Sequence, residues 1–202
     1  MHCCRGCSAD FFRIGPACPV CALPSLGGSR CGPCATRPPA FDRTIAALRY
    51  AYPIDRLVQA LKYNRQLPLA RALAGLLGDA LSPGSTQLLV PVPLGPQRLR
   101  ARGFNQSFEI ARHLGLRLGL PVMPRAAVRV RETVQQADLA LDERARNMRG
   151  AFAVSSAVLG RRIAIVDDVM TTGTTLAELA QAAKRAGAIE VEAWVVARAY
   201  KD

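Results

Sequence analysis

The chain has 202 residues, 50% of them hydrophobic, which allows one sizeable core and a small appended module. No apolar run is long enough to span a membrane, and residues 1–10 lack a signal-peptide core, so we expect a soluble, cytoplasmic protein. The formal net charge of +12 would suit an anionic partner, either nucleic acid or a phosphorylated small molecule. All but three of the 27 basic residues are arginine, an excess that the codons of a genome rich in G and C would also produce, so composition alone favours neither explanation.

The first element expected along the chain is a cysteine-rich module at residues 1–38. All seven cysteines precede residue 35, and they include three C-x2-C pairs. A C-x2-C pair on a tight turn directs two thiolates at one point, and two such pairs supply the four tetrahedral ligands of a structural zinc ion. Disulfides are less suitable because nothing indicates secretion, and a redox pair would normally begin a helix. We predict a zinc site whose ligands are Cys18, Cys21, Cys31 and Cys34.

The third C-x2-C pair, Cys4 and Cys7, makes only half of a metal site. The further donors close to it in sequence are Cys3 and His2. Either these residues complete a poor second zinc site, or a partner pair is missing upstream. We include Cys4 and Cys7 among the predicted metal ligands.

Strands and helices alternate through residues 39–202, a region that Pro38 and Pro39 separate from the cysteine module. Such alternation predicts an α/β fold with a mainly parallel sheet that helices cover on both faces. Ligands of these sheets bind at the carboxyl ends of the strands. The apolar patterns predict strands at residues 45–52, 88–93, 125–130, 161–168 and 189–200, and helices at residues 54–61, 67–81, 108–118 and 174–186.

Two polar segments lie between these elements, at residues 97–106 and 131–150. The first reads QRLRARGFNQ, and 11 arginines against five acids fall within residues 91–150. The guanidinium groups of Arg98, Arg100 and Arg102, together with a helix end after Asn105, can converge on an anion. The alternative is a solvated basic face with Asn105 as a helix cap. The second segment is charged and predicted to be mostly loop.

Residues 161–179, RRIAIVDDVMTTGTTLAEL, join a buried strand to two adjacent acids. Residues 163–166 form the fully buried type of strand, so we expect Asp167 and Asp168 to emerge where the sheet stops. Successive side chains of a strand point to opposite faces, so the two carboxylates can hold different atoms of one ligand. A vicinal diol suits them, and a divalent cation can bridge the same groups.

A threonine–glycine loop follows the acids, immediately before a predicted helix. Its backbone N–H groups, its hydroxyls and the positive end of the helix form a phosphate cradle, which a glycine lets the ligand approach closely. A carboxylate pair beside a phosphate cradle suits a ribose 5-phosphate. The alternative is an ordinary strand–turn–helix in which Asp and Thr merely cap the helix. The loop consists of Thr171, Thr172, Gly173, Thr174 and Thr175.

This stretch resembles the motif of the type I phosphoribosyltransferases, in which two acids and a T-T-G-T-T loop follow an apolar strand. The resemblance implies that Asp167 and Asp168 are catalytic residues contacting the ribose hydroxyls of phosphoribosyl pyrophosphate. It also implies that the loop wraps the 5-phosphate and that Mg²⁺ accompanies the pyrophosphate. The reaction of that family displaces pyrophosphate from C1 of the ribose, chiefly by positioning and charge stabilisation.

Nearly the whole chain is similar to the ComF family, through CPVCALP, CGPC, VPVPLGPQRLRARGFNQS, RETVQQADLALDERARNMRGAF and VDDVMTTGTTL. That family joins a cysteine finger to a type I phosphoribosyltransferase fold and includes a competence protein needed for natural transformation. Its members often carry a further C-x2-C upstream, which implies that Cys4 and Cys7 are half of a first zinc site in a shortened chain. The resemblance implies substrate contacts by Arg102, Asn105 and Gln106, and by Gln136 in a flexible lid.

Three functions are open at this point. The first is an enzyme that transfers a phosphoribosyl group to an unknown nucleophile, and the second is a factor that handles single-stranded DNA with competence and recombination proteins. The third is a regulator that binds the sugar phosphate without turning it over. Among other side chains, we expect Lys62 to be a surface lysine rather than a phosphate contact. We expect Phe104, Phe108 and Trp194 to be core residues rather than base-stacking platforms.

Overall fold

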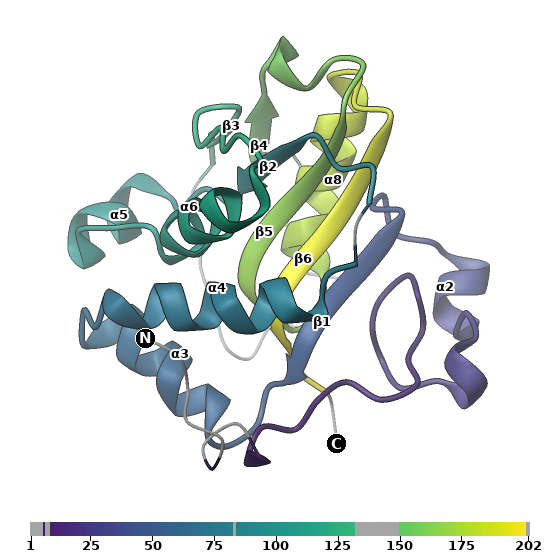
Figure 1. Cartoon of the computed structure of the whole chain (residues 1–202). Helices are drawn as coiled ribbons and strands as arrows, with labels where there is room; N and C mark the ends of the chain where they lie inside the picture. The colour runs from purple at the N-terminus through teal and green to yellow at the C-terminus, as the bar shows by residue number, and fades with distance from the viewer. Residues whose placement is uncertain (1–5, 7–8, 83, 132–149, 201–202) are drawn as a thin grey trace.

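A central parallel sheet organises the computed structural model, which describes residues 6, 9–82, 84–131 and 150–200 (Figure 1). Its four strands lie in the order β1–β6–β5–β2, and every neighbouring pair is parallel. The predicted α/β fold with a mainly parallel sheet is therefore confirmed. The strands are β1 (Arg43–Arg49), β6 (Glu190–Arg198), β5 (Arg162–Met170) and β2 (Leu88–Pro91).

Apolar layers cover both faces of the sheet because side chains alternate along each strand. On β5, Ile163 and Ile165 pack into one buried cluster, whereas Ala164 and Val166 pack into another. Each cluster is closed by helices, as the fully buried strand pattern predicts. The helices on the Val166 side are α3 (Ile54–Tyr63), α4 (Pro68–Ala80) and α6 (Gln106–Leu118), and the helix on the Ile165 side is α8 (Thr174–Arg185).

The cysteine module packs on the α8 side of the sheet, beside the edge strand β1 (Figure 1). Three of its cysteines are buried in the same cluster as apolar residues of α8. Thr44 of β1 fixes the module, because its N–H donates to the Pro19 carbonyl at 3.1 Å and its Oγ1 donates to the Val20 carbonyl at 2.6 Å. The short helices of the module are η1 (Leu26–Gly28) and α2 (Gly32–Thr36).

The basic segment at residues 97–106 contains a helix, α5 (Pro96–Arg102), that the sequence pattern did not predict. Pro96 opens this helix, and Gly103 ends it in a left-handed conformation with φ 82°. Proline at the start and glycine just past the end are common helix boundaries. None of the residues of α5 is buried, so the sequence carries no apolar periodicity that would identify this helix.

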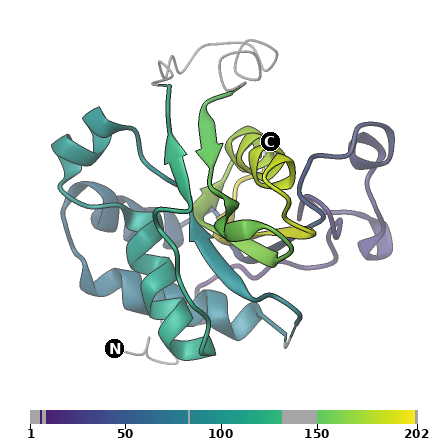
Figure 2. The same cartoon turned by 90° about the horizontal axis from the view of Figure 1, so that it is seen from above.

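A hairpin lies apart from the main sheet (Figure 2). The predicted strand at residues 125–130 is present as β3 (Ala127–Arg129), and it pairs antiparallel with β4 (Phe152–Val154), which was not predicted. The 3-10 helix η2 (Ser156–Val158) then leads into β5. Within the described residues, no helix is both long and apolar enough to cross a bilayer.

Candidate functional site

The two adjacent acids lie at a step in the sheet, where β2 ends before β5 does. Pairing of β2 with β5 stops at Pro91 and Val166, whereas pairing of β5 with β6 continues to Met170. Asp167 and Asp168 thus have β6 on one side, whereas β2 does not extend to them on the other. We expected the two acids to emerge where the sheet stops. This is correct for the pairing with β2, which ends just before them, but wrong for the pairing with β6, which continues past them.

Both carboxylates accept hydrogen bonds from the first turn of α6. Ser107 Oγ donates to Asp167 Oδ1 at 2.7 Å, and Gln106 Nε2 donates to Asp168 Oδ1 at 3.3 Å. Asn105 caps the helix by accepting from the Ser107 and Phe108 amides at 2.9 Å and 3.3 Å. Its Nδ2 also donates to the Val92 carbonyl at 2.9 Å, which ties α6 to the end of β2. The cap therefore orients the turn that holds the acids.

Lys62 at the end of α3 forms an ion pair with Asp168 Oδ2, although sequence alone suggested a surface lysine. Its side chain is 21% exposed and that of Asp168 is 3% exposed, so the pair is largely shielded from water. Burial lowers the pKa of Lys62, but the attraction of Asp168 and then of Asp167 outweighs burial and raises it. The available signal was its spacing, because Lys62 follows the buried Val58 by four residues on the helix.

The surroundings of Asp167 favour the protonated form of its carboxyl group. Burial raises the pKa of its carboxyl, and the neighbouring charge of Asp168 raises it further. Lys62 and the Ser107 hydroxyl oppose the increase, and the resulting pKa is about 7. Two carboxylates this close resist being ionised together, which makes Asp167 a group that can exchange a proton near neutral pH.

The threonine–glycine loop, residues 171–175, joins β5 to α8. Gly173 is the N-cap residue of α8 with φ 81°, and a Cβ there would lie 2.6 Å from Met170 Cε. Thr172 Oγ1 lies 2.9 Å from Thr174 Oγ1 and accepts from the Thr174 amide at 3.4 Å. The two aspartates form hydrogen bonds with α6 and an ion pair with α3, and neither caps α8. The alternative prediction, in which these acids merely cap the helix, is therefore wrong. The loop thus places hydroxyls at the positive end of a 12-residue helix.

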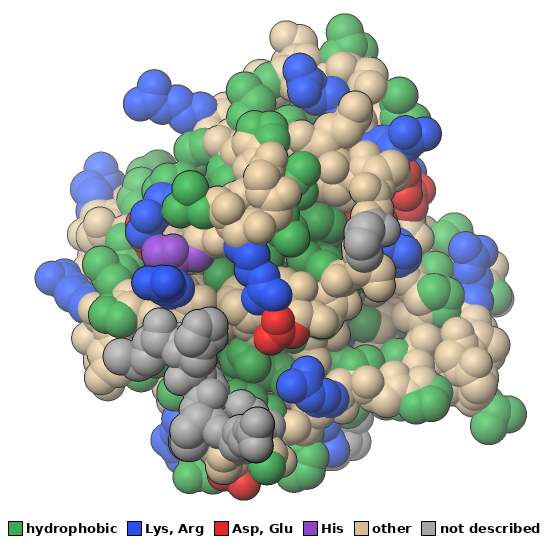
Figure 3. All heavy atoms as spheres, in the orientation of Figure 1, with side chains coloured by type: hydrophobic (Ala, Val, Ile, Leu, Met, Phe, Trp, Pro, Cys, Tyr) green, Lys and Arg blue, Asp and Glu red, His purple; other side chains and the backbone are tan. Residues whose placement is uncertain are grey.

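A basic cavity of about 270 Å³ lies between the end of α3 and α5. Arg102 reaches over the ring of Tyr63 at 5.5 Å and donates to Gln106 Oε1, which connects the cavity to Asp168. Arg98 and Arg102 are four residues apart on α5 and both line the cavity, whereas Arg100 does not. Lys and Arg side chains predominate over Asp and Glu on the face shown in Figure 3. The lining residues are Lys62, Tyr63, Arg65, Arg98, Ala101 and Arg102.

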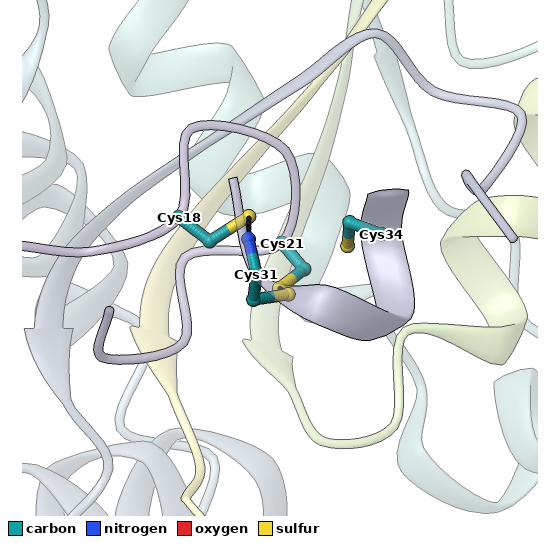
Figure 4. Close-up of side chains that lie close together, drawn as sticks. All are labelled: Cys18, Cys21, Cys31 and Cys34. Atoms are coloured by element: carbon teal, nitrogen blue, oxygen red, sulfur yellow. Dashed lines mark hydrogen bonds between the residues drawn. The ribbon is translucent and has the colours of Figure 1, made fainter. Parts of the chain in front are cut away.

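Four cysteines converge in the module, and we call this group and its turns the cysteine knuckle (Figure 4). Their Sγ atoms all lie within 4.8 Å of one another, and the Cys21 and Cys31 sulfurs are 3.6 Å apart. A tetrahedral zinc ion with Zn–S bonds of about 2.3 Å requires S···S distances of about 3.8 Å. The knuckle therefore fits a metal ion of this kind. Its members are Cys18, Cys21, Cys31 and Cys34.

One knuckle sulfur already has the hydrogen bonding expected of a metal-bound thiolate. The Cys31 amide donates to Cys18 Sγ at 3.4 Å. Burial raises the pKa of the Cys18 thiol, but backbone N–H donors, with Cys31 first among them, outweigh burial and lower the pKa to about 6. A thiol must lose its proton to bind a metal, so the surroundings of Cys18 favour metal binding. Burial raises the pKa of the Cys21 and Cys34 thiols instead.

The structure brings together most of the predicted site residues. Asp167, Asp168, Asn105, Gln106 and Arg102 form one connected network, and the threonine–glycine loop follows it directly along the chain. Gln136, Cys4 and Cys7 lie outside the described residues, as does nearly all of the predicted lid segment.

Comparison with known proteins identifies relatives along nearly the full chain. A family model described as a phosphoribosyl transferase domain matches residues 101–202. DNA utilization protein YhgH of Salmonella typhimurium is 37% identical over 203 residues, covering 96% of this chain and 89% of that protein. Competence protein F of Haemophilus influenzae is 30% identical over 207 residues, covering 97% and 90%. A solved purine phosphoribosyltransferase from Pyrococcus horikoshii is 17% identical with a TM-score of 0.36, covering 77% of this chain and 78% of that one.

The raised pKa of Asp167 predicts a pH-dependent stability that Asp167→Asn removes. Between pH values of about 4 and 7 the unfolded chain releases this proton while the folded chain keeps it, so rising pH favours unfolding. The stability of the wild type relative to Asp167→Asn should fall by at most about 1.4 kcal/mol per pH unit across this window. Urea unfolding at several pH values measures the difference.

The control for this experiment is Asp79→Asn, which changes a carboxylate of α4 paired with Arg117 on the surface. Its pH profile should run parallel to that of the wild type between pH values of about 5 and 7. Parallel profiles for the wild type and Asp167→Asn would contradict the raised pKa.

Proposed function

The chain belongs to the family of DNA utilization protein YhgH and Competence protein F, and on that premise we propose that it binds a ribose 5-phosphate ligand such as phosphoribosyl pyrophosphate. The observation that carries this proposal is the direct succession of a shielded carboxylate pair and a threonine–glycine loop at a helix N-terminus. Ionised carboxylates accept hydrogen bonds from a vicinal diol. The loop and the helix end suit a phosphate dianion about one sugar ring away.

Each part of the site then has a role. Asp167 and Asp168 accept from the ribose hydroxyls while Ser107, Gln106 and Lys62 keep both carboxylates in place. In the basic cavity, Arg98 and Arg102 suit the pyrophosphate group, whose negative charge grows when its bond to C1 breaks. The residues with roles in 5-phosphate binding are Thr171, Thr172, Gly173, Thr174 and Thr175.

Magnesium is part of this proposal because the site offers hard oxygen donors. Carboxylate oxygens of Asp167 and Asp168 fit Mg²⁺, which prefers oxygen ligands and usually retains waters and substrate phosphates. The ion would neutralise pyrophosphate charge. The chain itself supplies orientation and preorganised donors, which is the main requirement of a transfer that proceeds through a cation-like ribose.

Calorimetry with ribose 5-phosphate and with phosphoribosyl pyrophosphate, each with Mg²⁺, tests the proposal. Asp168→Asn removes an ionised acceptor worth about 1.5–3 kcal/mol, which corresponds to roughly 10- to 150-fold weaker binding. Gly173→Ala should also weaken binding, because a residue with a Cβ is strained in the left-handed conformation that Gly173 adopts with φ 81°. Asp79→Asn, a surface change on α4, should leave the affinity unaltered.

Absence of binding by the wild type would refute this assignment of the site. Release of pyrophosphate on addition of bases, nucleosides or oligonucleotides would identify the chain as a transferase. Binding without release in every case would instead assign it the role of a sugar-phosphate-responsive regulator.

We further propose that single-stranded DNA is a partner, contacting the basic cavity. A relative bears the name DNA utilization protein, and the cavity combines four cations with Tyr63, a residue that is 71% exposed. Arg65 in its lining has a left-handed backbone conformation with φ 52°, which is uncommon outside glycine and concentrates at functional sites. Aromatic stacking and guanidinium contacts are the usual means of holding single strands.

Fluorescence anisotropy with a labelled oligonucleotide at several salt concentrations tests this partner. Each phosphate contact contributes a slope of about −0.7 to the plot of log K against log salt, so Arg65→Gln should flatten the plot. Tyr63→Ala should lose about 1–3 kcal/mol of stacking with little change in slope. Arg162→Gln, at the opposite end of β5, is the matched control. An affinity that does not depend on salt would contradict the proposal.

We also propose that the metal of the cysteine knuckle is zinc, and that the protein works in the reducing cytoplasm, where thiolates persist. Elemental analysis should find zinc, and Cys18→Ser should release one equivalent. The Cys4→Ser/Cys7→Ser double variant should retain that equivalent, and any second equivalent should disappear with it. Full zinc content in Cys18→Ser would refute zinc binding by the knuckle.

A further inference from the structure

Arg198, the last residue of β6, is a buried cation that the proposed binding site does not use. It is 3% exposed, and its guanidinium donates only to backbone carbonyls among the partners found for it. A buried charge is costly unless its donors are satisfied, and these carbonyls satisfy several of them. The acceptors are the carbonyls of Cys21 at 2.8 Å, Met170 at 2.9 Å, Ala199 at 2.7 Å and Thr171 at a shorter distance.

The acceptors of Arg198 belong to two sites that are distant in sequence. Nε donates to Cys21, a member of the cysteine knuckle, while Nη1 donates to Met170 and Thr171, where the threonine–glycine loop begins. One rigid, planar group therefore connects the knuckle to the loop. Lysine could not hold both sides in the same way, because its single ammonium lacks the fork geometry.

Packing beneath the loop provides a second, independent connection. A Cβ on Gly173 would contact Met170 and lie 3.8 Å from Phe41 Cζ, so these two side chains form the floor of the loop. Both side chains belong to the buried cluster that also contains the knuckle cysteines. Thr44 Oγ1 donates to the Val20 carbonyl within the knuckle and lies 4.0 Å from Met170 Sδ. The knuckle and the loop thus rest on shared side chains as well as on Arg198.

We propose that Arg198 is a positioning residue through which the metal-bound cysteine knuckle holds the threonine–glycine loop in its phosphate-binding shape. The inference rests on the proposed function of the loop. A phosphate cradle binds tightly when its amides and hydroxyls are already aimed, because the cost of ordering them is then not incurred on binding. The knuckle turn keeps its shape when the metal fixes its sulfurs, and the Cys21 carbonyl then anchors Arg198.

With zinc bound, the thiolates of the metal centre would also supply a counter-charge for the buried guanidinium. Four thiolates and one Zn²⁺ carry two net negative charges, on the same turns that present the Cys21 carbonyl to Arg198. Loss of the ion would remove this anchor at one end of the bridge. The loop at the other end would then lose its preferred shape, and its affinity for phosphate would fall.

Amide hydrogen exchange at residues 171–175, together with calorimetry using ribose 5-phosphate and Mg²⁺, tests the coupling. In Arg198→Met, exchange in the loop should accelerate at least tenfold and affinity should fall at least tenfold. Removing zinc from the wild type should produce a similar change in both measurements. Arg162→Met, which breaks an exposed ion pair with Glu190 at the other end of β5, should behave as the wild type does.

Combining the two changes separates positioning from general destabilisation. If Arg198 transmits the effect of the metal, zinc removal should have little additional effect on the loop in Arg198→Met. Arg198→Lys should retain part of the affinity but lose most of its dependence on zinc. Thr44→Val leaves the metal ligands and Arg198 intact but removes the hydrogen bond from Thr44 to the Val20 carbonyl of the knuckle. Loss of this one hydrogen bond should weaken binding about two- to fivefold.

Two results would overturn the inference. The first is that Arg198→Met and Arg162→Met have the same amide exchange rates in the loop and the same affinity for ribose 5-phosphate. The second is that zinc removal changes loop exchange and affinity in Arg198→Met as much as it does in the wild type. Absence of ribose 5-phosphate binding by the wild type would refute the proposed function instead, and loop exchange measured without ligand would still decide whether the knuckle and the loop are coupled.

Discussion

The unequal lengths of β2 and β5 are the constraint on which the site depends. Because β2 ends opposite Val166, the next residues of β5 have a strand on only one side, and the first turn of α6 fills part of the other. Pairing with β6 continues to Met170, so the carboxylates sit on a rigid backbone rather than on a loop. Side chains of α3 and α6, rather than a neighbouring strand, therefore meet these acids on that side, and Asp168 is almost fully buried among them.

Placing two carboxylates side by side in this step requires compensation. Lys62 balances Asp168, and α6 supplies neutral donors to both acids. Burial, together with the remaining repulsion from Asp168, still raises the pKa of Asp167. Such a shielded ion pair contributes little net stability, because desolvation offsets its attraction. Under the proposed function, a ligand that donates hydroxyl hydrogens to both carboxylates would reduce their mutual repulsion.

The sequence was sufficient to predict those parts of the site whose residues are neighbours along the chain. The buried run before Asp167, the threonine–glycine loop and the C-x2-C spacing each express local geometry, and the structure gives each the expected form. Lys62 and Tyr63 could not be placed, because their importance depends on how α3 packs against β5 and α5. Arg198 was equally hidden, since its acceptors come from segments more than 20 and more than 170 residues away. Helical spacing shows which face of α3 carries Lys62, but it does not show which segment that face meets.

The two faces of the sheet divide the work of the proposed site. Side chains from α3 and α6 hold the carboxylates, whereas the cysteine knuckle and β6 support the loop on the α8 side. A ribose 5-phosphate has its diol and its phosphate at a fixed separation. Its affinity would therefore change if the supports on one face of the sheet moved relative to those on the other. A knuckle that belongs to the same buried cluster as α8 is therefore suited to govern the phosphate end, while the carboxylate end keeps its own independent supports.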